Sequence, residues 1–472
     1  MPNPTYLFYD IETTGLNKCF DQVLQFAAIR TDESFNELSR DEIQVTLNND
    51  VIPSPGAVIT HRIGVDQFSK GISEYDAMQK IHALFNTPNT ISVGYNTLGF
   101  DDEFLRFSFY KNLLPPYTHQ YANNCGRMDI YPITLLYYLF KKDHLIWPSN
   151  KGVVSLKLEN INLSNHFAHG QAHNAMFDVE VTLALAKKLH EDKTMWHFVT
   201  DYFQKKIDEN RIAAADSALK IADKNVTMGF MVNAKIGAAS QFIAPVIHLG
   251  QHQHYKNQSV WLRLDNSDLI NTKSNAIKKT TKILRKRLAE PPIFLPIKDR
   301  YLNLLSDDRK NIFVDNQSWL EKNSVLFKAI SDFYQHEKYP EVSGCDADAA
   351  LYMIDFPTPK EENVFRQFHA AKDDKKESVA LQIQHPVRQA QAMRILGRHF
   401  REHLSEKYQH DFEEYLKTTP IDFRGEKKLT RENALVEIDQ LMKNKVLDEE
   451  QQKLLGGLKY FVETSIHRVS DL

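Results

Sequence analysis

The sequence lacks the features that would place the protein in a membrane or in an oxidising compartment. No apolar run approaches the ~18 residues of a membrane span. The N-terminus, MPNPTYLFYD, has neither the basic nor the apolar segment of a signal peptide. Cys19, Cys125 and Cys345 are too far apart to form a zinc-binding pattern, and they suggest no disulfide framework. We therefore expect a cytoplasmic protein with no membrane association.

The chain also lacks an excess of charge of either sign, internal repeats and low-complexity tracts. Its formal net charge is −3 over 472 residues, so binding to nucleic acid requires a local positive surface. A chain of this length exceeds a single hydrophobic core. Changes in pattern along it predict a mixed α/β domain over 1–197, a β-rich domain over 198–355 and an all-helical domain over 356–472.

The predicted elements follow from hydrophobic spacing and turn residues. In the first domain we expect strands at 5–12, 23–32, 42–49 and 90–96, the first three forming an antiparallel meander, and helices at 73–85, 100–114 and 173–191. In the second we expect strands at 226–234, 241–250 and 258–266, a basic helix at 272–290 and an extended segment at 291–298. In the third we expect helices at 387–404, 411–419, 431–446 and 449–466.

The segment FYDIETTGL, residues 8–16, places two carboxylates inside an apolar strand. Side chains two residues apart share one face of a strand, so Asp10 and Glu12 point the same way and repel each other. A divalent cation is the simplest way to offset that repulsion.

Further acidic groups follow at positions where an α/β fold presents functional side chains. Asp101 comes just after a predicted strand and near a helix start. Asp178 falls about one turn into the predicted helix, and His173 lies at the entrance to that helix. Each has a structural alternative: Asp101 can cap a helix, and His173 can be a core histidine.

Together these groups predict a two-metal site. Four carboxylates carry a charge of −4, which two Mg²⁺ ions offset, and Mn²⁺ can substitute because both ions prefer oxygen ligands. Such a pair binds a phosphodiester, activates water and stabilises the leaving oxygen. A neutral histidine accepts the proton of the attacking water near neutral pH.

Three motifs now resemble those of a known nuclease class. D-x-E-T-T-G at Asp10, GYN…FDDEF around Asp101 and H-N-A-M-F-D ending at Asp178 are similar to the three motifs of the DEDDh 3′→5′ exonucleases, which have a ribonuclease H-like fold. The sister class carries Tyr four residues before the last Asp, where this chain has Asn174, so the histidine form fits better.

Over nearly the whole chain, LQFAAIRTD (24–32), PGAVIT (55–60), YNTLGFDDE (95–103) and AHNAMFD (172–178) resemble bacterial exonuclease I. The resemblance implies an exonuclease domain with a mixed sheet, a small SH3-like β-barrel domain and a C-terminal all-helical domain. It implies 3′→5′ degradation of single-stranded DNA to 5′-mononucleotides, in DNA repair or recombination. We expect the degradation to be processive because the second and third domains would close around the strand. The implied partner is the acidic C-terminal tail of single-stranded DNA-binding protein, and we expect a monomer.

By the same resemblance, Asp10, Glu12, Asp101 and Asp178 bind metal and His173 is the catalytic base. The predicted substrate contacts are Glu12 and four further side chains, and each of these four can instead have a purely structural role. Lys157 and Arg106 are cations that can face phosphate or simply be solvated, and Tyr117 and Tyr121 can stack on bases or pack within a loop.

Two clusters of positive charge have no assigned role. Residues 273–287 hold seven Lys and Arg residues and no acid, which indicates a basic helix that faces either nucleic acid or solvent. Arg394, Arg398 and Arg401 are spaced to line one side of a helix, as a track for DNA, a site for an acidic peptide or a solvated face.

Two other functions compete with DNA hydrolysis. A DEDDh exoribonuclease uses the same metal chemistry, because discrimination of the 2′-hydroxyl depends on pocket shape. The 270 or so residues beyond the nuclease motifs argue against the compact RNA-trimming enzymes. A non-catalytic DNA-binding scaffold is the other alternative, but all five predicted site residues are present.

Overall fold

The computed structural model describes residues 3–168, 170, 174–215, 219–443 and 446–464. The chain divides into two compact units. The first comprises Met1–Arg127, Ala168–Leu183 and Pro340–Leu472, and the second comprises Met128–Phe167 and Ala184–Tyr339. The C-terminal helices thus belong to the same unit as the N-terminal strands, while the three predicted domain ranges stay a prediction.

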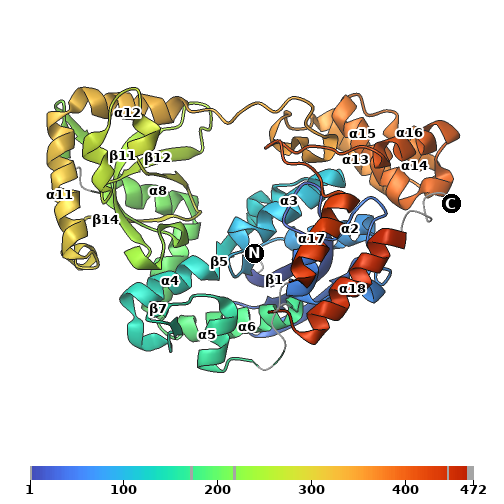
Figure 1. The fold of residues 1–472 in the computed structure, drawn as a ribbon, viewed down its shortest axis with the longest axis horizontal. Helices are drawn as coiled ribbons and strands as arrows, with labels where there is room; N and C mark the ends of the chain where they lie inside the picture. The colour runs from blue at the N-terminus through green and yellow to red at the C-terminus, as the bar shows by residue number, and fades with distance from the viewer. Residues whose placement is uncertain (1–2, 169, 171–173, 216–218, 444–445, 465–472) are drawn as a thin grey trace. The chain divides into compact units, whose positions relative to one another are not determined.

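A mixed sheet forms the centre of the first unit, as predicted (Figure 1). Its strands are β1 (Thr5–Thr13), β2 (Val23–Thr31), β3 (Glu37–Gln44), β4 (Thr90–Gly94) and β5 (Gly126–Asp129), in the order β3-β2-β1-β4-β5. The first three strands are an antiparallel meander, and β4 runs parallel to β1. The third strand lies five residues before its predicted position because it is an edge strand, whose polar side chains hide the usual apolar signal.

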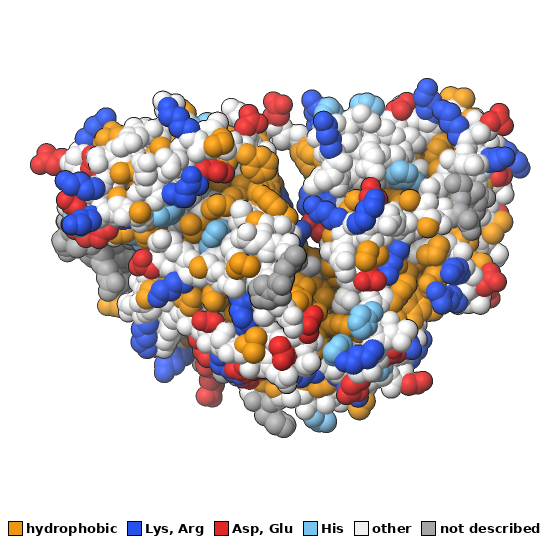
Figure 2. Space-filling view, turned by 180° about the vertical axis from the view of Figure 1, so that it is seen from behind, with side chains coloured by type: hydrophobic (Ala, Val, Ile, Leu, Met, Phe, Trp, Pro, Cys, Tyr) orange, Lys and Arg blue, Asp and Glu red, His pale blue; other side chains and the backbone are white. Residues whose placement is uncertain are grey.

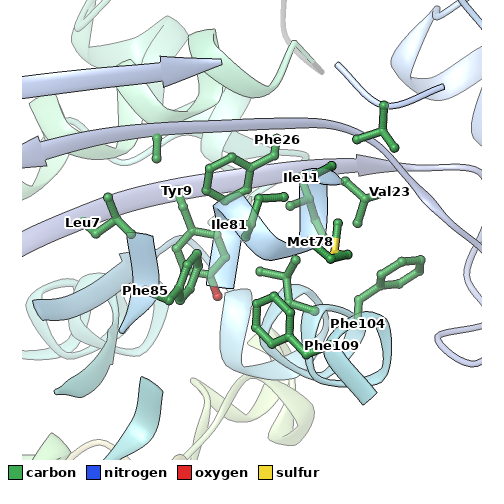
Figure 3. Close-up of a cluster of buried hydrophobic side chains, with 14 residues drawn as sticks. Leu7, Tyr9, Ile11, Val23, Phe26, Met78, Ile81, Phe85, Phe104 and Phe109 are labelled. Carbon is green, nitrogen blue, oxygen red and sulfur yellow. The ribbon is translucent and has the colours of Figure 1, made fainter. Parts of the chain in front are cut away.

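One face of β1 packs on helices α2 (Glu74–Phe85) and α3 (Asp101–Lys111). Figure 3 shows Leu7, Tyr9 and Ile11 of β1 on the side of these helices, among side chains such as Phe104. Ser73 begins α2 by accepting a hydrogen bond from Asp76 N, as the Ser start predicted. Side chains alternate between the two faces of a strand. The polar residues between the apolar ones of β1 therefore point to the opposite face.

The remaining helices of the first unit include α13 to α18, which confirm the helical C-terminal region. They are α1 (Pro55–His61), α6 (Ala175–His190, which continues into the second unit), α13 (Pro359–Ala370), α14 (Asp373–Ala380), α15 (Pro386–His399), α16 (Glu406–Leu416), α17 (Arg431–Met442) and α18 (Glu449–Thr464). Leu455 and Leu458 of α18 share a buried cluster with Leu24 and Val58, so the last helices complete a core begun near the N-terminus.

The arginine stripe of α15 is an internal ion-pair network, which corrects the expectation of a solvated or ligand-binding face. Arg398 donates to Asp50 Oδ1 at 3.1 Å and to Asp348 Oδ2 at 2.7 Å, and its side chain is only 6% exposed. Arg394 pairs with Asp346 at 2.5 Å. Arg401 lies beyond the end of α15 and pairs with Glu413. These carboxylates lie far away in the sequence, so helical spacing alone did not reveal them.

The second unit contains the predicted β-rich structure. Its main sheet is antiparallel, in the order β13-β12-β11-β10-β14. These strands are β10 (Met228–Val232), β11 (Ile243–Gln251), β12 (Gln258–Arg263), β13 (Ile283–Arg287) and β14 (Ile293–Pro296). Short pairs are β6 (Ser149–Asn150) with β7 (Val153–Val154) and β8 (Leu219–Ile221) with β9 (Lys224–Val226). The helices are α4 (Ile130–Phe140), α5 (Leu158–Asn165), α7 (Lys193–Thr200), α8 (Lys205–Ala213), α9 (Ile277–Thr280), α10 (Asp299–Leu302), α11 (Asp307–Lys322) and α12 (Ser324–His336).

The basic helix predicted over 272–290 is wrong. Only the short helix α9 forms there, and the segment continues as strand β13, which pairs with β12. Lys286 of that strand is buried and contacts Asp208 Oδ2 at 2.5 Å, and Arg285 pairs with Glu337 at 2.5 Å. Part of the positive charge is therefore neutralised inside the unit. The local sequence did not show this, since the acidic partners belong to other elements.

The surface shows no long-range separation of charge on the face seen in Figure 2, where Lys and Arg side chains are interspersed with Asp and Glu. This agrees with the small net charge. None of the helices in the described part of the chain is both long and apolar enough to cross a bilayer.

Candidate metal centre and active site

Strand β1 presents Asp10 and Glu12 on the face opposite its apolar core residues. Both are partly buried, whereas Ile11 between them is 5% exposed and packs in the core. On the neighbouring strand β2, Asp10 is paired with Ala27 and Glu12 with Gln25. The small Ala27 side chain leaves space beside the Asp10 carboxylate, since directly paired residues of antiparallel strands share a face.

Asp178 joins these two carboxylates from the first turn of α6. One oxygen from each of Asp10, Glu12 and Asp178 lies within 4.8 Å of the others. The start of the helix is tied to the sheet by a contact of 3.4 Å from Ala175 N to Gln25 Oε1. A strand face and a helix start thus bring together residues more than 160 positions apart.

Asp101 is the first residue of α3 and is 8% exposed. The helix has Phe100 at its N-cap position, and no capping hydrogen bond by a side chain is made there. The Asp101 carboxylate raises the pKa of both Asp10 and Glu12, so it lies within electrostatic reach of the cluster. The structure therefore brings all four predicted carboxylates into one electrostatic environment.

The cluster is electrostatically strained without a cation. Burial, and after it the charges of Asp101, Glu12 and Asp178, raise the pKa of Asp10 well above its usual range. Burial and the charges of Asp178 and Asp101 raise the pKa of Glu12 to about 9. A bound divalent cation favours the ionised carboxylates and lowers these pKa values. The donors are all carboxylate oxygens, which suit Mg²⁺ or Mn²⁺. His173, the predicted base, lies outside the described residues.

The turn after Glu12 is held by a buried carboxylate that the sequence analysis missed. Asp21 accepts hydrogen bonds from Thr14 Oγ1 at 2.9 Å and Asn17 N at 2.8 Å, and it is 8% exposed. A Cβ on Gly15 would meet the Asp21 carboxyl oxygen at 2.5 Å, which explains the glycine there. Lys111 Nζ donates to Asp21 O at 3.0 Å and supports the turn from α3. The available signal was an acid flanked by the apolar pairs at 19–20 and 23–24.

Arg106 lies inside the first unit, close to Asp101 in the sequence. Its guanidinium pairs with Asp102 at 2.7 Å and is 5.0 Å from the centre of the Tyr117 ring, and the residue is 8% exposed. Asp102 also contacts His119 and Arg127. Burial raises the pKa of Asp102, but the charge of Arg127, the hydrogen bond with His119 and the charge of Arg106 together hold it well below its usual range. Arg106 and Tyr117 therefore help to build the region beside Asp101.

The other predicted substrate contacts are exposed. Tyr121 is 67% exposed, so its ring is accessible for stacking. Lys157 lies in the second unit, just before α5, and its ammonium is 3.5 Å from Glu159 Oε1. The roles of Lys157, Arg106, Tyr117 and Tyr121 toward substrate stay predictions.

Comparison with known proteins gives consistent matches at both ends of the chain. The family model described as Exonuclease matches residues 7–186, and the one described as Exonuclease I C-terminal domain matches residues 345–465. The Exodeoxyribonuclease I of Buchnera aphidicola subsp. Baizongia pistaciae is 29% identical over 78% of this chain and 78% of that protein. The Escherichia coli K12 Exodeoxyribonuclease I is 29% identical over 74% of this chain and 76% of that protein.

Solved structures share the fold of the whole chain. E. coli exonuclease I in complex with a dA16 oligonucleotide has a TM-score of 0.85 and 22% identity, covering 98% of this chain and 100% of that one. The zinc-bound form of an E. coli ExoI–ssDNA complex has a TM-score of 0.86 and 22% identity, covering 99% and 100%. An SSB/Exonuclease I structure with the inhibitor CFAM has a TM-score of 0.82 and 22% identity, covering 98% and 100%. These matches confirm the predicted fold class.

Proposed function

Because the chain belongs to the bacterial exonuclease I family, we propose that it is a metal-dependent 3′→5′ exonuclease that degrades single-stranded DNA to 5′-mononucleotides. The observation that carries the proposal is the grouping of Asp10, Glu12 and Asp178 within 4.8 Å, with Asp101 in electrostatic reach. The relatives named exodeoxyribonuclease I favour DNA over the exoribonuclease alternative.

In this proposal the four carboxylates hold two Mg²⁺ ions, or Mn²⁺ in their place. Bound ions of this kind polarise the phosphodiester and lower the pKa of the attacking water. Asp10 and Glu12 bind from the sheet, Asp178 binds from α6 and Asp101 from α3, so the ligands come from separate rigid elements. Ligands on rigid elements keep their geometry as successive nucleotides pass.

The proposed reaction is an in-line displacement at the last phosphodiester. His173 takes a proton from water, whose oxygen attacks the phosphorus. The bond from phosphorus to the 3′-oxygen of the preceding nucleotide breaks, and that oxygen takes up a proton. The products are a 5′-mononucleotide and a strand one nucleotide shorter with a free 3′-hydroxyl, which is the substrate for the next cycle. We propose that the reaction is processive.

We also propose that the protein acts with single-stranded DNA-binding protein, through the acidic tail of that partner. The solved SSB/Exonuclease I structure supports this choice. The expected roles are in DNA repair or recombination, and the expected state is a cytoplasmic monomer.

The test compares 3′-labelled and 5′-labelled single-stranded DNA, duplex DNA and RNA, each with Mg²⁺, Mn²⁺ or EDTA. We expect labelled mononucleotide from the 3′-labelled strand at once, loss of activity in EDTA, and little cleavage of RNA or duplex. Asp178→Asn is the matched variant, and it should lose hydrolysis but keep DNA binding. Internal cuts, digestion from the 5′ end or near-normal turnover by Asp178→Asn in Mg²⁺ would contradict the proposal.

A further inference from the structure

Two exposed histidines of the second unit lie next to each other at the end of α12. His254 is in the connection between β11 and β12, and His336 is the last residue of α12 (Figure 1). The centres of their rings are 6.5 Å apart. The two residues are far apart in the sequence, so only the fold brings them together.

The segment that carries His254 is fixed to the end of α12. Gln253 N donates to Gln335 O at 2.9 Å. The buried His252 ring donates from Nε2 to Glu337 O at 2.9 Å, and its Nδ1 accepts from His254 N at 3.1 Å. These contacts use both nitrogens of His252. This ring therefore holds the segment in place, and the exposed neighbour is left to bind a ligand.

His336 presents one ring nitrogen to solvent. Its Nδ1 donates to Asp332 O at 2.8 Å, which leaves the lone pair on Nε2. Histidines that bind a metal ion commonly donate their other ring N–H to a carbonyl or carboxylate in this way. Among the residues that the structure describes, none forms a hydrogen bond with the ring of His254. Each of the two rings therefore has a nitrogen available.

The separation of the rings suits one shared metal ion. Two nitrogens bound to the same Zn²⁺ lie at most ~4.2 Å apart, which is twice the usual Zn–N distance. A ring centre lies about 1.1 Å behind its nitrogen, so the centres of two ligating rings are at most about 6.4 Å apart. The observed 6.5 Å is at this limit. Because both side chains are exposed, a small rotation brings both nitrogens to one ion.

We propose that His254 and His336 bind a transition-metal ion such as Zn²⁺ or Ni²⁺, with water completing its coordination. Imidazole nitrogen suits these ions, whereas Mg²⁺ and Mn²⁺ prefer carboxylate oxygen, so this site differs in kind from the carboxylate cluster. The neighbouring Glu337 carboxylate already pairs with Lys278 and Arg285. The ion fastens the connection between β11 and β12 to the end of α12, and it takes no part in the proposed hydrolysis.

The experiment titrates Ni²⁺ into the whole chain by isothermal titration calorimetry, with excess Mg²⁺ to occupy the carboxylate cluster. Ni²⁺ is the probe because imidazole is one of its preferred ligands. We expect His254→Ala and His336→Ala each to weaken one binding site at least about tenfold, the lower end of the effect of disrupting a metal site. The control is His410→Ala, which removes an exposed histidine of α16 and should bind Ni²⁺ like the unaltered protein.

A variant with both substitutions shows whether the two histidines share one ion. If they do, it loses the same single site as either variant alone. Hydrogen exchange gives a second measurement. Ni²⁺ should slow exchange at 252–256 and 332–338 in the unaltered protein but in neither single variant, because a bound ion holds these segments together. Ni²⁺ binding and exchange that both single substitutions leave unchanged would overturn the proposal, and so would losses that add up to two separate sites.

Discussion

Glu12→Gln should make the metal-free protein more stable at alkaline pH while it destroys activity. The folded protein raises the pKa of Glu12 from 4.5 to about 9, chiefly by burial and then by the charges of Asp178 and Asp101. Between those two values the unfolded chain binds fewer protons than the folded one, so the stability of the folded state falls as pH rises. Below 4.5 both states are protonated, and above about 9 both are ionised.

The magnitude follows from proton linkage. A full proton difference changes the free energy of unfolding by about 1.4 kcal/mol per pH unit, so the interval from pH 5 to pH 8 gives at most about 4 kcal/mol. Glutamine has the same shape and no titration, so its substitution removes this contribution. Mg²⁺ acts in the opposite direction on the unaltered protein, because it binds the ionised carboxylates and stabilises the folded state by mass action.

The assay is urea unfolding between pH 5 and pH 8.5, in EDTA and in Mg²⁺. We expect the unaltered protein to lose stability with rising pH in EDTA, and Glu12→Gln to lose less. Mg²⁺ should stabilise the unaltered protein most at high pH and should have much less effect on Glu12→Gln. Glu33→Gln, at an exposed carboxylate outside the cluster, is the control and should behave like the unaltered protein. The reasoning is refuted if Glu12→Gln and Glu33→Gln show the same pH dependence in EDTA.

Three further substitutions test other parts of the molecule. His173→Ala should reduce hydrolysis by roughly 10²–10⁴ and recover partly at high pH, where hydroxide replaces the base; a normal rate at pH 7 would remove its catalytic role. Arg398→Ala should lower the free energy of unfolding by about 3–5 kcal/mol, because it leaves Asp50 and Asp348 buried without this partner. A loss of less than about 1 kcal/mol in urea unfolding would contradict this. Tyr121→Ala should weaken oligonucleotide binding by about 1–3 kcal/mol if the exposed ring stacks on a base, and unchanged anisotropy would exclude stacking.

The sequence by itself determined the local framework of the site. Period-two alternation placed Asp10 and Glu12 on one strand face, and apolar spacing with a Ser start predicted α2 almost to the residue. These signals work because backbone geometry decides them within a few residues. The three motifs likewise indicated the nuclease class, and the fold confirms its architecture.

Tertiary structure decided what each charge does. The spacing of Arg394 and Arg398 suggested an open stripe, yet Asp346, Asp348 and Asp50 neutralise it from other parts of the chain. Lys286 was expected on a helix and lies on a strand, paired with an acid 78 residues away. The raised pKa values of the metal cluster also appear only when β1, α3 and α6 meet. A charge interacts with whatever lies near it in space, and burial determines how strongly it interacts, so neither the partner nor the strength can be read from neighbours in the sequence.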